Sequence, residues 1–300
     1  MGGCLACLLL LAGCSAQLEK PQAEGVSFTD ANGNAVTVAS HDRVVSLYGS
    51  FAQTWMLAGG TLVGTTSDAI EERKLDLGEG VQNIGTVKQP NLEAVFALEP
   101  DFVILSADIE AQAKLDAPLT QAGIAHAYFR EDSLEEYLSM LQLFCSMTGR
   151  ADCYQQYGAE VEQQIEQVVA SVQGKPAPTV LLLRAYSSGV KAKTDDNLAG
   201  VILKDLGCDN IADRVPSLLE ELSLEAIVAE DPDFIFVTTM GDEQKALDAL
   251  EANMQTQPAW QGLTAVKEGR YVVLPKDLFH YKPNNRWGES YAYLADILYP

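Results

Sequence analysis

The stretch NLEAVFALEPDFVIL runs from Asn91 to Leu105, and a second copy, SLEAIVAEDPDFIFV, runs from Ser223 to Val237. Seven of the fifteen positions are identical, and most of the others exchange one apolar residue for another. Asn91 and Ser223 favour the N-cap of a helix, and the apolar residues that follow have helical spacing. In each copy a proline ends the helix, and a short apolar strand follows, of the type that is buried on both faces of a parallel sheet. The two copies therefore predict two α/β units of the same design.

Each copy lies within a longer alternation of strands and helices. Before the first copy, GVSFTDANGNAVTVAS predicts a β-hairpin with a turn at Asn32-Gly33, RVVSLYG a buried strand, FAQTWMLAGG a helix and TLVGTTS a strand. After it, AQAKLDAPLTQAG predicts a helix, IAHAYF a strand and SLEEYLSMLQLFCSMTG a helix. The second half repeats this order, with the strands TVLLLRAY and RYVVL and the helices NLAGVILKDLG, DEQKALDALEANM and ESYAYLADILY.

Between the halves, residues 151–174 predict one helix of about 35 Å at 1.5 Å per residue. We therefore expect an α/β fold of two Rossmann-like lobes, with mainly parallel sheets, joined by one long α-helix. Open α/β sheets bind ligands at the carboxyl ends of their strands, so a ligand cleft between the lobes is expected. The expected boundaries are 26–150 for the N-terminal lobe, 151–174 for the interlobe helix and 175–300 for the C-terminal lobe.

The composition excludes some functions. The chain is 47% hydrophobic and 21% charged, which is typical of a globular protein. It has 42 acidic residues against 20 Lys plus Arg, a formal net charge of −22. Nucleic acid is not an expected partner, because phosphate binding needs a basic patch. Such a charge instead favours solubility and mutual repulsion.

The N-terminus, MGGCLACLLLLAGCSAQ, has the apolar run of a secretory signal and is too short to span a bilayer. Its end, Leu11 to Cys14, resembles a bacterial lipobox, which implies that Cys14 carries lipid and begins the mature chain. No Lys or Arg precedes the apolar run, so either the true start lies upstream or the signal is weak. We expect residues 1–14 to be a lipoprotein signal, 15–25 a tether, and the protein to be extracytoplasmic and lipid-anchored to the cell membrane.

Three cysteines remain once Cys4, Cys7 and Cys14 are set aside: Cys145, Cys153 and Cys208. An odd number cannot form a complete set of intramolecular disulfides, and neither a CxxC motif nor a zinc-type spacing occurs. Free, mostly buried thiols are expected, and one bridge, Cys145–Cys153, stays open as an alternative.

Five segments together resemble the substrate-binding lipoproteins of ABC importers for ferric siderophores, haem and cobalamin. They are RVVSL, the two copies quoted above, PAWQGLTAVKEGRYVVLP and RWGESYAYLADILYP, and they cover roughly residues 26–300 in the family's order. The resemblance implies a monomer with a rigid interlobe helix and a small closure, with no enzymatic activity and no intrinsic cofactor. It implies an ABC permease dimer as partner and a metal chelate, foremost a ferric siderophore, as ligand. Haem and cobalamin are the alternatives.

The resemblance also implies a role for the matched glutamates Glu93 and Glu225. In the family, glutamates of this motif dock onto arginine pockets of the permease. The other interpretation is structural, since a glutamate in the first turn of a helix stabilises the helix dipole by ~0.3–1 kcal/mol. Neither residue is at the capping-box position, and both copies place Glu identically, which favours docking.

The loops after the predicted strands supply the expected ligand contacts. Cations and aromatic rings gather there and suit a large, planar or anionic chelate, although each could also be an ordinary surface side chain. The expected contacts are Tyr48, Ser50, Phe51, Lys88, Arg184, Tyr186, Met240, Phe279, His280 and Tyr281, with the further cations Lys276, Lys282 and Arg286 close by. The cations count against cobalamin, which is held with few charges.

Arg184 and Lys88 are expected to bridge the chelate from opposite lobes, with Tyr48 and Tyr186 as ring contacts. Haem would need an axial ligand, for which Tyr48, Tyr186, Met240 and His280 are the candidates. The family keeps an Arg-Trp pair like Arg286-Trp287 to seat the last helix. Trp55 and Trp287 are expected near the cleft.

Two other classes of protein fit less well. An extracellular enzyme on the same scaffold would need a signature such as GxSxG, HExxH, GxGxxG or Walker A, and none occurs. The three histidines, His41, His126 and His280, lie in dissimilar contexts, which makes a triad or metal cluster hard to build. A carbohydrate-binding or adhesin-type surface protein would not need twinned lobes with matched glutamates. The colour of the purified protein would separate these classes, because haem, ferric catecholates and corrinoids absorb visible light.

Overall fold

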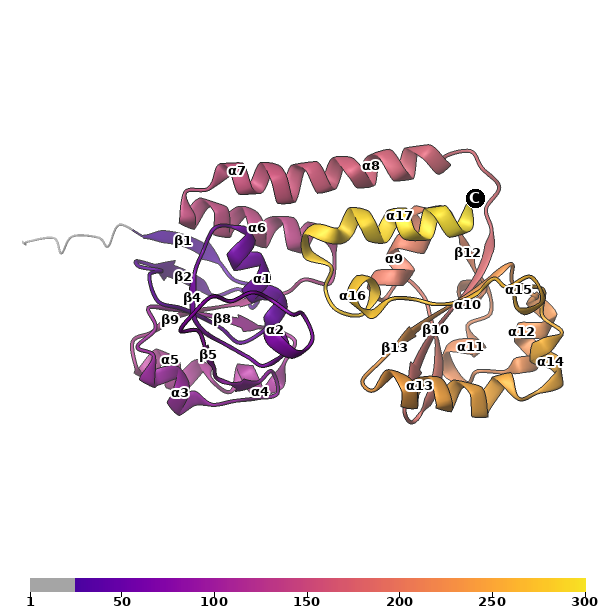
Figure 1. Ribbon diagram of the computed structural model, residues 1–300, viewed down its shortest axis with the longest axis horizontal. Coiled ribbons are helices and arrows are strands. Elements are labelled where there is room, and N and C mark those ends of the chain that lie inside the picture. The colour runs from indigo at the N-terminus through magenta and orange to yellow at the C-terminus, as the bar shows by residue number, and fades with distance from the viewer. Residues whose placement is uncertain (1–24) are drawn as a thin grey trace, which may run out of the picture.

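The computed structural model describes residues 25–300, which form two α/β lobes lying side by side (Figure 1). Helices α8 (Glu160–Val172) and α17 (Trp287–Leu298) run together along one side of the molecule and link the lobes. The predicted fold class is confirmed. The signal, the lipobox with Cys14, and most of the tether lie outside the described residues.

The N lobe contains a five-stranded parallel sheet in the order β5-β4-β3-β8-β9. Its strands are β3 (Val44–Ser46), β4 (Leu62–Thr65), β5 (Gln82–Asn83), β8 (Phe102–Ser106) and β9 (Ala125–Phe129). The predicted hairpin is present as the antiparallel pair β1 (Val26–Thr29) and β2 (Ala35–Val38), and a second small hairpin is formed by β6 (Gly85–Thr86) and β7 (Gln89–Pro90). The helices are α1 (Gly49–Leu57), α2 (Asp68–Glu71), α3 (Leu92–Ala97), α4 (Glu110–Ala113), α5 (Asp116–Gln121) and α6 (Leu134–Thr148).

The stretch AQAKLDAPLTQAG is helical, as predicted, and it forms two short helices, α4 and α5. The chain turns at Lys114 and Leu115, where the Leu115 N–H donates to the carbonyl of Gln112 at 3.0 Å. Pro118 then lies in the first turn of α5, where its missing N–H costs no helical hydrogen bond. The proline therefore fits the start of a new helix better than the interior of a longer one.

The C lobe contains the sheet β11-β10-β13-β14, with β12 also paired to β10. Its strands are β10 (Thr179–Tyr186), β11 (Gly189–Lys193), β12 (Asp209–Asn210), β13 (Phe234–Thr239) and β14 (Tyr271–Val273), and the β10–β11 pair is antiparallel while the others are parallel. The helices are α9 (Leu198–Asp205), α10 (Ile211–Arg214), α11 (Ser217–Glu220), α12 (Leu224–Glu230), α13 (Glu243–Leu250), α14 (Pro258–Gln261), α15 (Thr264–Lys267) and α16 (Lys276–Phe279), with a π turn η2 (Glu251–Gln255) and a 3-10 turn η3 (Asn284–Arg286).

The repeated stretch forms α3–β8 in the N lobe and α12–β13 in the C lobe. Asn91 and Ser223 are the N-caps, and their side chains accept from the backbone N–H three residues later at 3.1 and 3.3 Å. Each helix ends beside a residue with positive φ, Glu99 at 45° and Asp231 at 42°, directly before the proline. A residue before proline avoids the right-handed helical region, so the same sequence ends both helices in the same way.

The aspartate that follows the proline has the same task in both lobes. The Asp101 carboxylate accepts from the backbone N–H of Arg43 at 3.0 Å, and that of Asp233 accepts from the N–H of Thr179 at 2.8 Å. Each bond ties the repeated unit to the start of the neighbouring strand, β3 or β10. The Pro-Asp pair is therefore explained by the fold itself.

The interlobe helix differs from a plain α-helix. It consists of α7 (Ala151–Tyr154), a π turn η1 (Gln155–Ala159) and α8. A π turn disturbs the regular backbone ladder, and the hydroxyl of Tyr137 donates to the carbonyl of Tyr157 inside it at 2.7 Å. Beside α8, Gly288 of α17 approaches closely, because a Cβ there would lie 2.6 Å from Oε1 of Gln164.

One apolar core extends from lobe to lobe beneath these helices. It joins the inner face of the N-lobe sheet (Phe102, Ile104) to the inner face of the C-lobe sheet (Phe236). Helices α8 and α17, called the spine helices below, contribute Ile165 and Leu294. The outer face of each sheet has a separate core. No helix within residues 25–300 is long and apolar enough to cross a membrane.

Candidate ligand-binding site

Tyr48 follows the end of β3 at the carboxyl edge of the N-lobe sheet and is the N-cap residue of α1. Its side chain is half-buried, and its ring meets that of Phe51 edge-on at 5.0 Å. Burial, followed by the negative charges of Glu131 and Asp68, raises the pKa of the Tyr48 phenol well above its usual value. The hydroxyl of Tyr48 is thus neutral at pH 7, and the side chain is poorly suited to binding a metal as phenolate.

Three of the expected contact residues are not at the surface. Ser50 and Phe51 are 1% exposed and Phe279 is 2% exposed. The buried face of α1 carries Ser50 and Phe51, and the ring of Phe279 packs 5.7 Å from that of Tyr293 on α17. Helix packing turns these three side chains into the protein, so they present no surface to a ligand in this structure.

Ser50 instead belongs to a buried polar cluster at the N-lobe sheet edge. Its hydroxyl donates to Oε2 of Glu131 at 2.6 Å. Glu131 is the second residue after β9. Burial raises the pKa of Glu131 to about 7, against the lowering effect of the Ser50 hydrogen bond and of the Arg73 and Lys282 charges. Nε of Arg73 donates to Oε1 of Gln53 at 2.9 Å. These groups hold loops together and leave no free face of Ser50 for a ligand.

Arg184 lies near the carboxyl end of β10, within the strand rather than in the loop after it. Its backbone is paired between Thr238 of β13 and Lys191 of β11. Its side chain is half-buried, and its buried Nε has no hydrogen-bond partner within the described part of the chain. A buried guanidinium N–H without a partner is costly, and the half-buried position of the side chain near the sheet edge makes Arg184 a candidate contact for an anionic ligand.

His280 lies directly after α16 and is half-buried. Burial lowers its pKa to about 4, and the positive charges of Lys276 and Arg184 act in the same direction. The folded pKa lies below the ordinary value, so the imidazole is neutral above pH ~5 and its charged form is disfavoured. A neutral imidazole can accept a hydrogen bond or bind a metal.

The remaining C-lobe residues lie in the segments that end at the same sheet edge or follow it. Tyr186 ends β10, and the N–H of Met240, after β13, donates to the carbonyl of Ala185 at 2.9 Å. The ring of Tyr281 lies 5.1 Å from that of His280. All three side chains are half-buried. The C-lobe edge therefore brings together Arg184, Tyr186, Met240, His280 and Tyr281 from three segments of the chain.

The other cations near these loops are already engaged by the protein. Lys276 Nζ donates to the carbonyl of Gly241 at 2.5 Å and lies 5.7 Å from the centre of the Tyr281 ring. Lys282 pairs with Asp132. Arg286 pairs with Asp277 and Glu289, each at 2.7 Å, at the start of α17, as expected for a residue that seats the last helix.

Lys88 lies in the turn between β6 and β7 and is exposed. The hairpin is held by Gln112, whose Nε2 donates to the carbonyl of Val87 at 3.2 Å. Lys88 is thus on the N lobe and Arg184 on the C lobe, which leaves their joint contact with one ligand as a proposal.

A pocket of about 240 Å³ is lined by residues of both the N lobe and the C-terminal segment. The N lobe contributes Gln53, Glu72, Arg73 and Lys74, and the C-terminal segment contributes Asp277, Tyr281, Pro283 and Arg286. It lies beside the junction of the lobes. Acidic and basic side chains both line this pocket, so it does not by itself favour an anionic or a cationic ligand.

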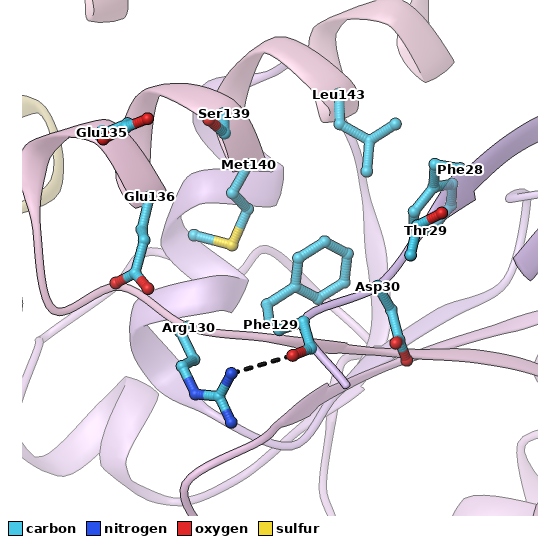
Figure 2. Close-up of a pocket in the computed structure, with 11 residues that line it drawn as sticks. Phe28, Thr29, Asp30, Phe129, Arg130, Glu135, Glu136, Ser139, Met140 and Leu143 are labelled. Atoms are coloured by element: carbon cyan, nitrogen blue, oxygen red, sulfur yellow. Dashed lines mark hydrogen bonds between the residues drawn. The ribbon is translucent and has the colours of Figure 1, made fainter. Parts of the chain in front are cut away.

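A larger pocket, of about 530 Å³, lies on the N lobe between β1 and α6 (Figure 2). Phe28, Phe129, Met140 and Leu143 form its apolar part. Its polar groups have structural partners: Nη1 of Arg130 donates to the carbonyl of Ala31 at 2.9 Å, the contact dashed in Figure 2, and Glu136 completes the capping box of α6. This pocket is built by local folding and contains none of the expected ligand contacts.

The two tryptophans expected near the cleft are buried in the protein. Trp55 and Trp287 are 0% and 1% exposed. Nε1 of Trp55 donates to the carbonyl of Thr61 at 2.9 Å, and its ring packs on Phe144. Both rings are core residues, so tryptophan fluorescence is a weak reporter of ligand binding here.

Glu93 and Glu225 are exposed in the first turns of α3 and α12. The two helices lie on the outer sides of the N lobe and the C lobe (Figure 1).

Cys145, Cys153 and Cys208 are free thiols. No group of three or more His, Cys, Asp or Glu side chains in residues 25–300 is arranged to hold a metal ion.

Sequence reasoning missed three residues that join the lobes: Arg73, Glu131 and Asn284. Arg73 sits in a run of charges, EERK, that reads as an ordinary exposed helix end. Glu131 follows β9 and could have been noticed as a strand-end acid. Nothing in the sequence around Asn284 indicates that its side chain is fully buried.

Two α/β lobes with polar and aromatic side chains at their strand ends define a two-lobe binding protein. A model of the periplasmic binding protein family matches residues 44–278, and the chain belongs to this family, the substrate-binding proteins of ABC importers for iron siderophores, haem and cobalamin. These are extracytoplasmic binding proteins and not enzymes, and they deliver small-molecule ligands to a permease.

Two curated relatives and one solved structure illustrate the match. The chain is 27% identical over 293 residues to the Fe(3+)-citrate-binding protein YfmC of Bacillus subtilis, covering 91% of this chain and 87% of that one. It is 25% identical over 245 residues to the Fe(3+) dicitrate-binding periplasmic protein FecB of Escherichia coli, covering 80% and 78%. The structure of Staphylococcus aureus IsdE complexed with heme aligns with a TM-score of 0.68 at 18% identity, covering 86% of this chain and 99% of that one, and so shares the fold.

Proposed function

We propose that this protein captures a ferric chelate with residual negative charge, foremost a ferric siderophore, and delivers it to an ABC permease dimer. The observation that carries the proposal is Arg184, whose buried Nε has no partner in the described protein. Tyr186 and Tyr281 beside it offer rings to a chelate, and Lys88 offers a second cation from the N lobe. Two curated relatives are named for binding ferric citrate, which supports an anionic iron complex as the ligand class.

The test is the affinity of Arg184→Ala for three ligands: ferric citrate, a ferric tricatecholate and cobalamin. A buried charge-assisted hydrogen bond is worth ~1.5–3 kcal/mol, so Arg184→Ala should weaken a bound anionic chelate by about one to two decades. A neutral corrinoid should be affected little. Isothermal titration and visible absorbance are the measurements, because the tryptophans are buried.

Arg214→Ala is the matched control. Arg214 lies on the same lobe and pairs with Asp209 and Glu230 at the surface, at 3.1 and 2.9 Å. It should leave ligand affinity unchanged. Equal affinity of Arg184→Ala and wild type for every ferric complex that binds would remove Arg184 from the site.

Haem is the second candidate ligand, and His280 favours it. Its imidazole is neutral at pH 7 and lies at the site beside Tyr281, so it could serve as an axial ligand. Tyr186 or Met240 could complete the coordination, whereas the raised pKa of Tyr48 disfavours phenolate. A Soret shift on adding haem that is lost in His280→Ala, together with no response to ferric chelates, would establish haem instead.

We also propose that Cys14 carries the lipid anchor and that the protein is held on the outer side of the cell membrane, as a monomer. One acyl chain gives marginal membrane binding and two or more give stable anchoring. Cys14→Ser should therefore appear in the soluble fraction of cells expressing the full chain. Retention of Cys14→Ser in the membrane fraction would show that another feature anchors the protein.

A further inference from the structure

The chain crosses between the lobes a second time, near its C-terminus. After β14 in the C lobe it forms α16, which is tied to that lobe by the Lys276–Gly241 contact at 2.5 Å. Residues 280–283 then lead to η3, which contacts α1 of the N lobe. Helix α17 returns to the C lobe, where the Tyr291 hydroxyl donates to Asp205 of α9 at 2.6 Å. The segment 280–286, called the hook below, thus leaves the C lobe, contacts the N lobe and leads back to the C lobe through α17.

Asn284 is the tip of this hook. Its side chain is 0% exposed, and its φ of 52° is unusual for a residue other than glycine. Nδ2 donates to the carbonyl of Ser50 at 3.0 Å and to Oγ1 of Thr54 at 2.6 Å, both on α1. Oδ1 accepts from the hydroxyl of Ser50 at 3.2 Å and from Nη2 of Arg73. One side chain therefore makes four contacts, all with the N lobe.

Neighbouring residues strengthen the same attachment. Nη2 of Arg73 also donates to the carbonyl of Lys282 at 2.8 Å. Lys282 pairs with Asp132 after β9. At its other end the segment is attached to the C lobe, because the N–H groups of His280 and Tyr281 donate to the carbonyl of Lys276 in α16, at 2.9 and 2.8 Å.

The free length between the two attachments is short. Residues 280–283 lie between α16 on the C lobe and Asn284 on the N lobe, and even fully extended four residues span at most about 14 Å. His280 and Tyr281 are bonded to α16 and Lys282 to the N lobe, so the free part is shorter still. Two of them, His280 and Tyr281, are residues of the proposed ligand site, and Tyr281 and Pro283 line the pocket between the lobes. Any opening of the lobes must therefore stretch or turn the part of the chain that faces the ligand.

We propose that residues 280–283 are a strap that limits the opening of the two lobes, and that Asn284 is its anchor and a positioning residue for His280 and Tyr281. The strap acts in parallel with α8, so that the lobes are held at two places instead of one. Releasing the anchor lets the lobes move apart and lets the ligand leave. The consequence for ligand release rests on the proposed function, but the limit on opening does not.

The experiment measures the distance between spin labels at Lys114→Cys on the N lobe and Lys245→Cys on the C lobe, in a background with all six native cysteines changed to Ala. Both lysines have side chains that are 71% exposed. Asn284→Gly deletes the anchor, and glycine adopts the positive φ without strain. The ligand-free Asn284→Gly protein should show a broader distance distribution that extends to longer values.

The matched control is Asn210→Ala in the C lobe. Asn210 is 8% exposed, and its side chain donates to the carbonyl of Lys193 at 2.8 Å and accepts from the N–H of Ala212 at 3.1 Å, so its loss also removes buried hydrogen bonds. It should lower the thermal stability and leave the label distances unchanged. Thr54→Val removes one partner of Asn284 while keeping the side-chain shape, and should broaden the distribution less than Asn284→Gly.

With ferric citrate as the probe, Asn284→Gly should raise the dissociation rate about tenfold and leave the association rate within about twofold, since most affinity changes appear in dissociation. An unchanged distance distribution in both Asn284→Gly and Thr54→Val would overturn the strap. So would equal broadening in Asn210→Ala, which would indicate general loosening. If wild type does not bind ferric citrate, the proposed function loses support while the distance measurement still decides the strap.

Discussion

Glu131 shows how one residue at the lobe junction can set the response of the protein to pH. It is 1% exposed, and burial raises its pKa to about 7, with Ser50, Arg73 and Lys282 opposing and Asp132 adding to the shift. The folded pKa is above that of the unfolded chain, so the protonated form is favoured by folding. Its stabilising contribution is complete below pH ~4.5 and is lost as the pH rises through about 7.

The prediction at this scale concerns Glu131→Gln, which imitates the protonated carboxyl. At pH 8 the variant should be more stable than wild type, by on the order of 3 kcal/mol at most, because it removes the cost of burying the charge. At pH 4.5 the two proteins should be about equally stable. Urea unfolding from pH 4.5 to 8 is the measurement, and parallel pH curves for the two proteins would show that Glu131 is not the titrating group.

At the scale of the element, helices α3 and α12 have the same local structure in the two lobes. Their caps, positive-φ ends and Pro-Asp pairs have structural explanations that apply equally in both lobes. The glutamates do not, because Glu93 and Glu225 are exposed and a first-turn charge adds only ~0.3–1 kcal/mol to a helix. We therefore propose that the pair docks onto the permease, with the spine helices fixing the separation of the two charges.

The docking prediction concerns Glu93→Arg combined with Glu225→Arg. Uptake of the bound ligand by cells should be lost, because charges across an interface set its register and encounter rate, while ligand affinity should stay within about twofold. The matched control is Glu110→Arg with Glu243→Arg, which reverses two exposed first-turn glutamates of α4 and α13. Normal uptake by the Glu93/Glu225 variant, or equal loss in the control, would contradict the docking role.

At the scale of the whole molecule, the net charge of −22 acts against the compact state. The ion pairs that involve exposed side chains contribute little each, ~0–1 kcal/mol, and cannot offset the repulsion among 42 acidic residues. Added salt should therefore increase the stability of the folded state, because it screens the repulsion among the acidic residues more than it weakens the ion pairs.

The prediction is that raising NaCl from ~10 mM to ~1 M increases the melting temperature by several degrees, because the Debye length falls from ~30 to ~3 Å. Calorimetry at pH 7.5 is the measurement. The same titration near pH 4.4, the isoelectric point of the sequence, is the control and should show a small or reversed effect. A melting temperature that falls with salt at pH 7.5 would mean that the ion pairs outweigh the repulsion.

Local patterns were sufficient for the architecture. Caps, prolines, helical spacing and apolar strands involve residues only a few positions apart, and their meaning does not depend on the rest of the chain. The two copies of one pattern therefore predicted the two α/β lobes, and three further segments were needed for the resemblance to the family. The same reasoning places Arg184 and Tyr186 at the carboxyl end of β10, because parallel strands end at one edge of the sheet, and their contact with a ligand stays a prediction.

The contacts across the molecule depend on packing that no local pattern records. Whether Ser50, Phe51 and Phe279 face a ligand or the core is set by the rotation of α1 and α16 against their neighbours, and packing turned all three inward. Asn284 meets Ser50 and Arg73 because segments that lie 234 and 211 positions apart in the chain converge at the lobe junction. The burial and the partners of a side chain depend on which distant segments pack against it. The sequence therefore predicted which residues lie at the sheet edges, but the buried contacts that join the lobes followed only from the tertiary structure.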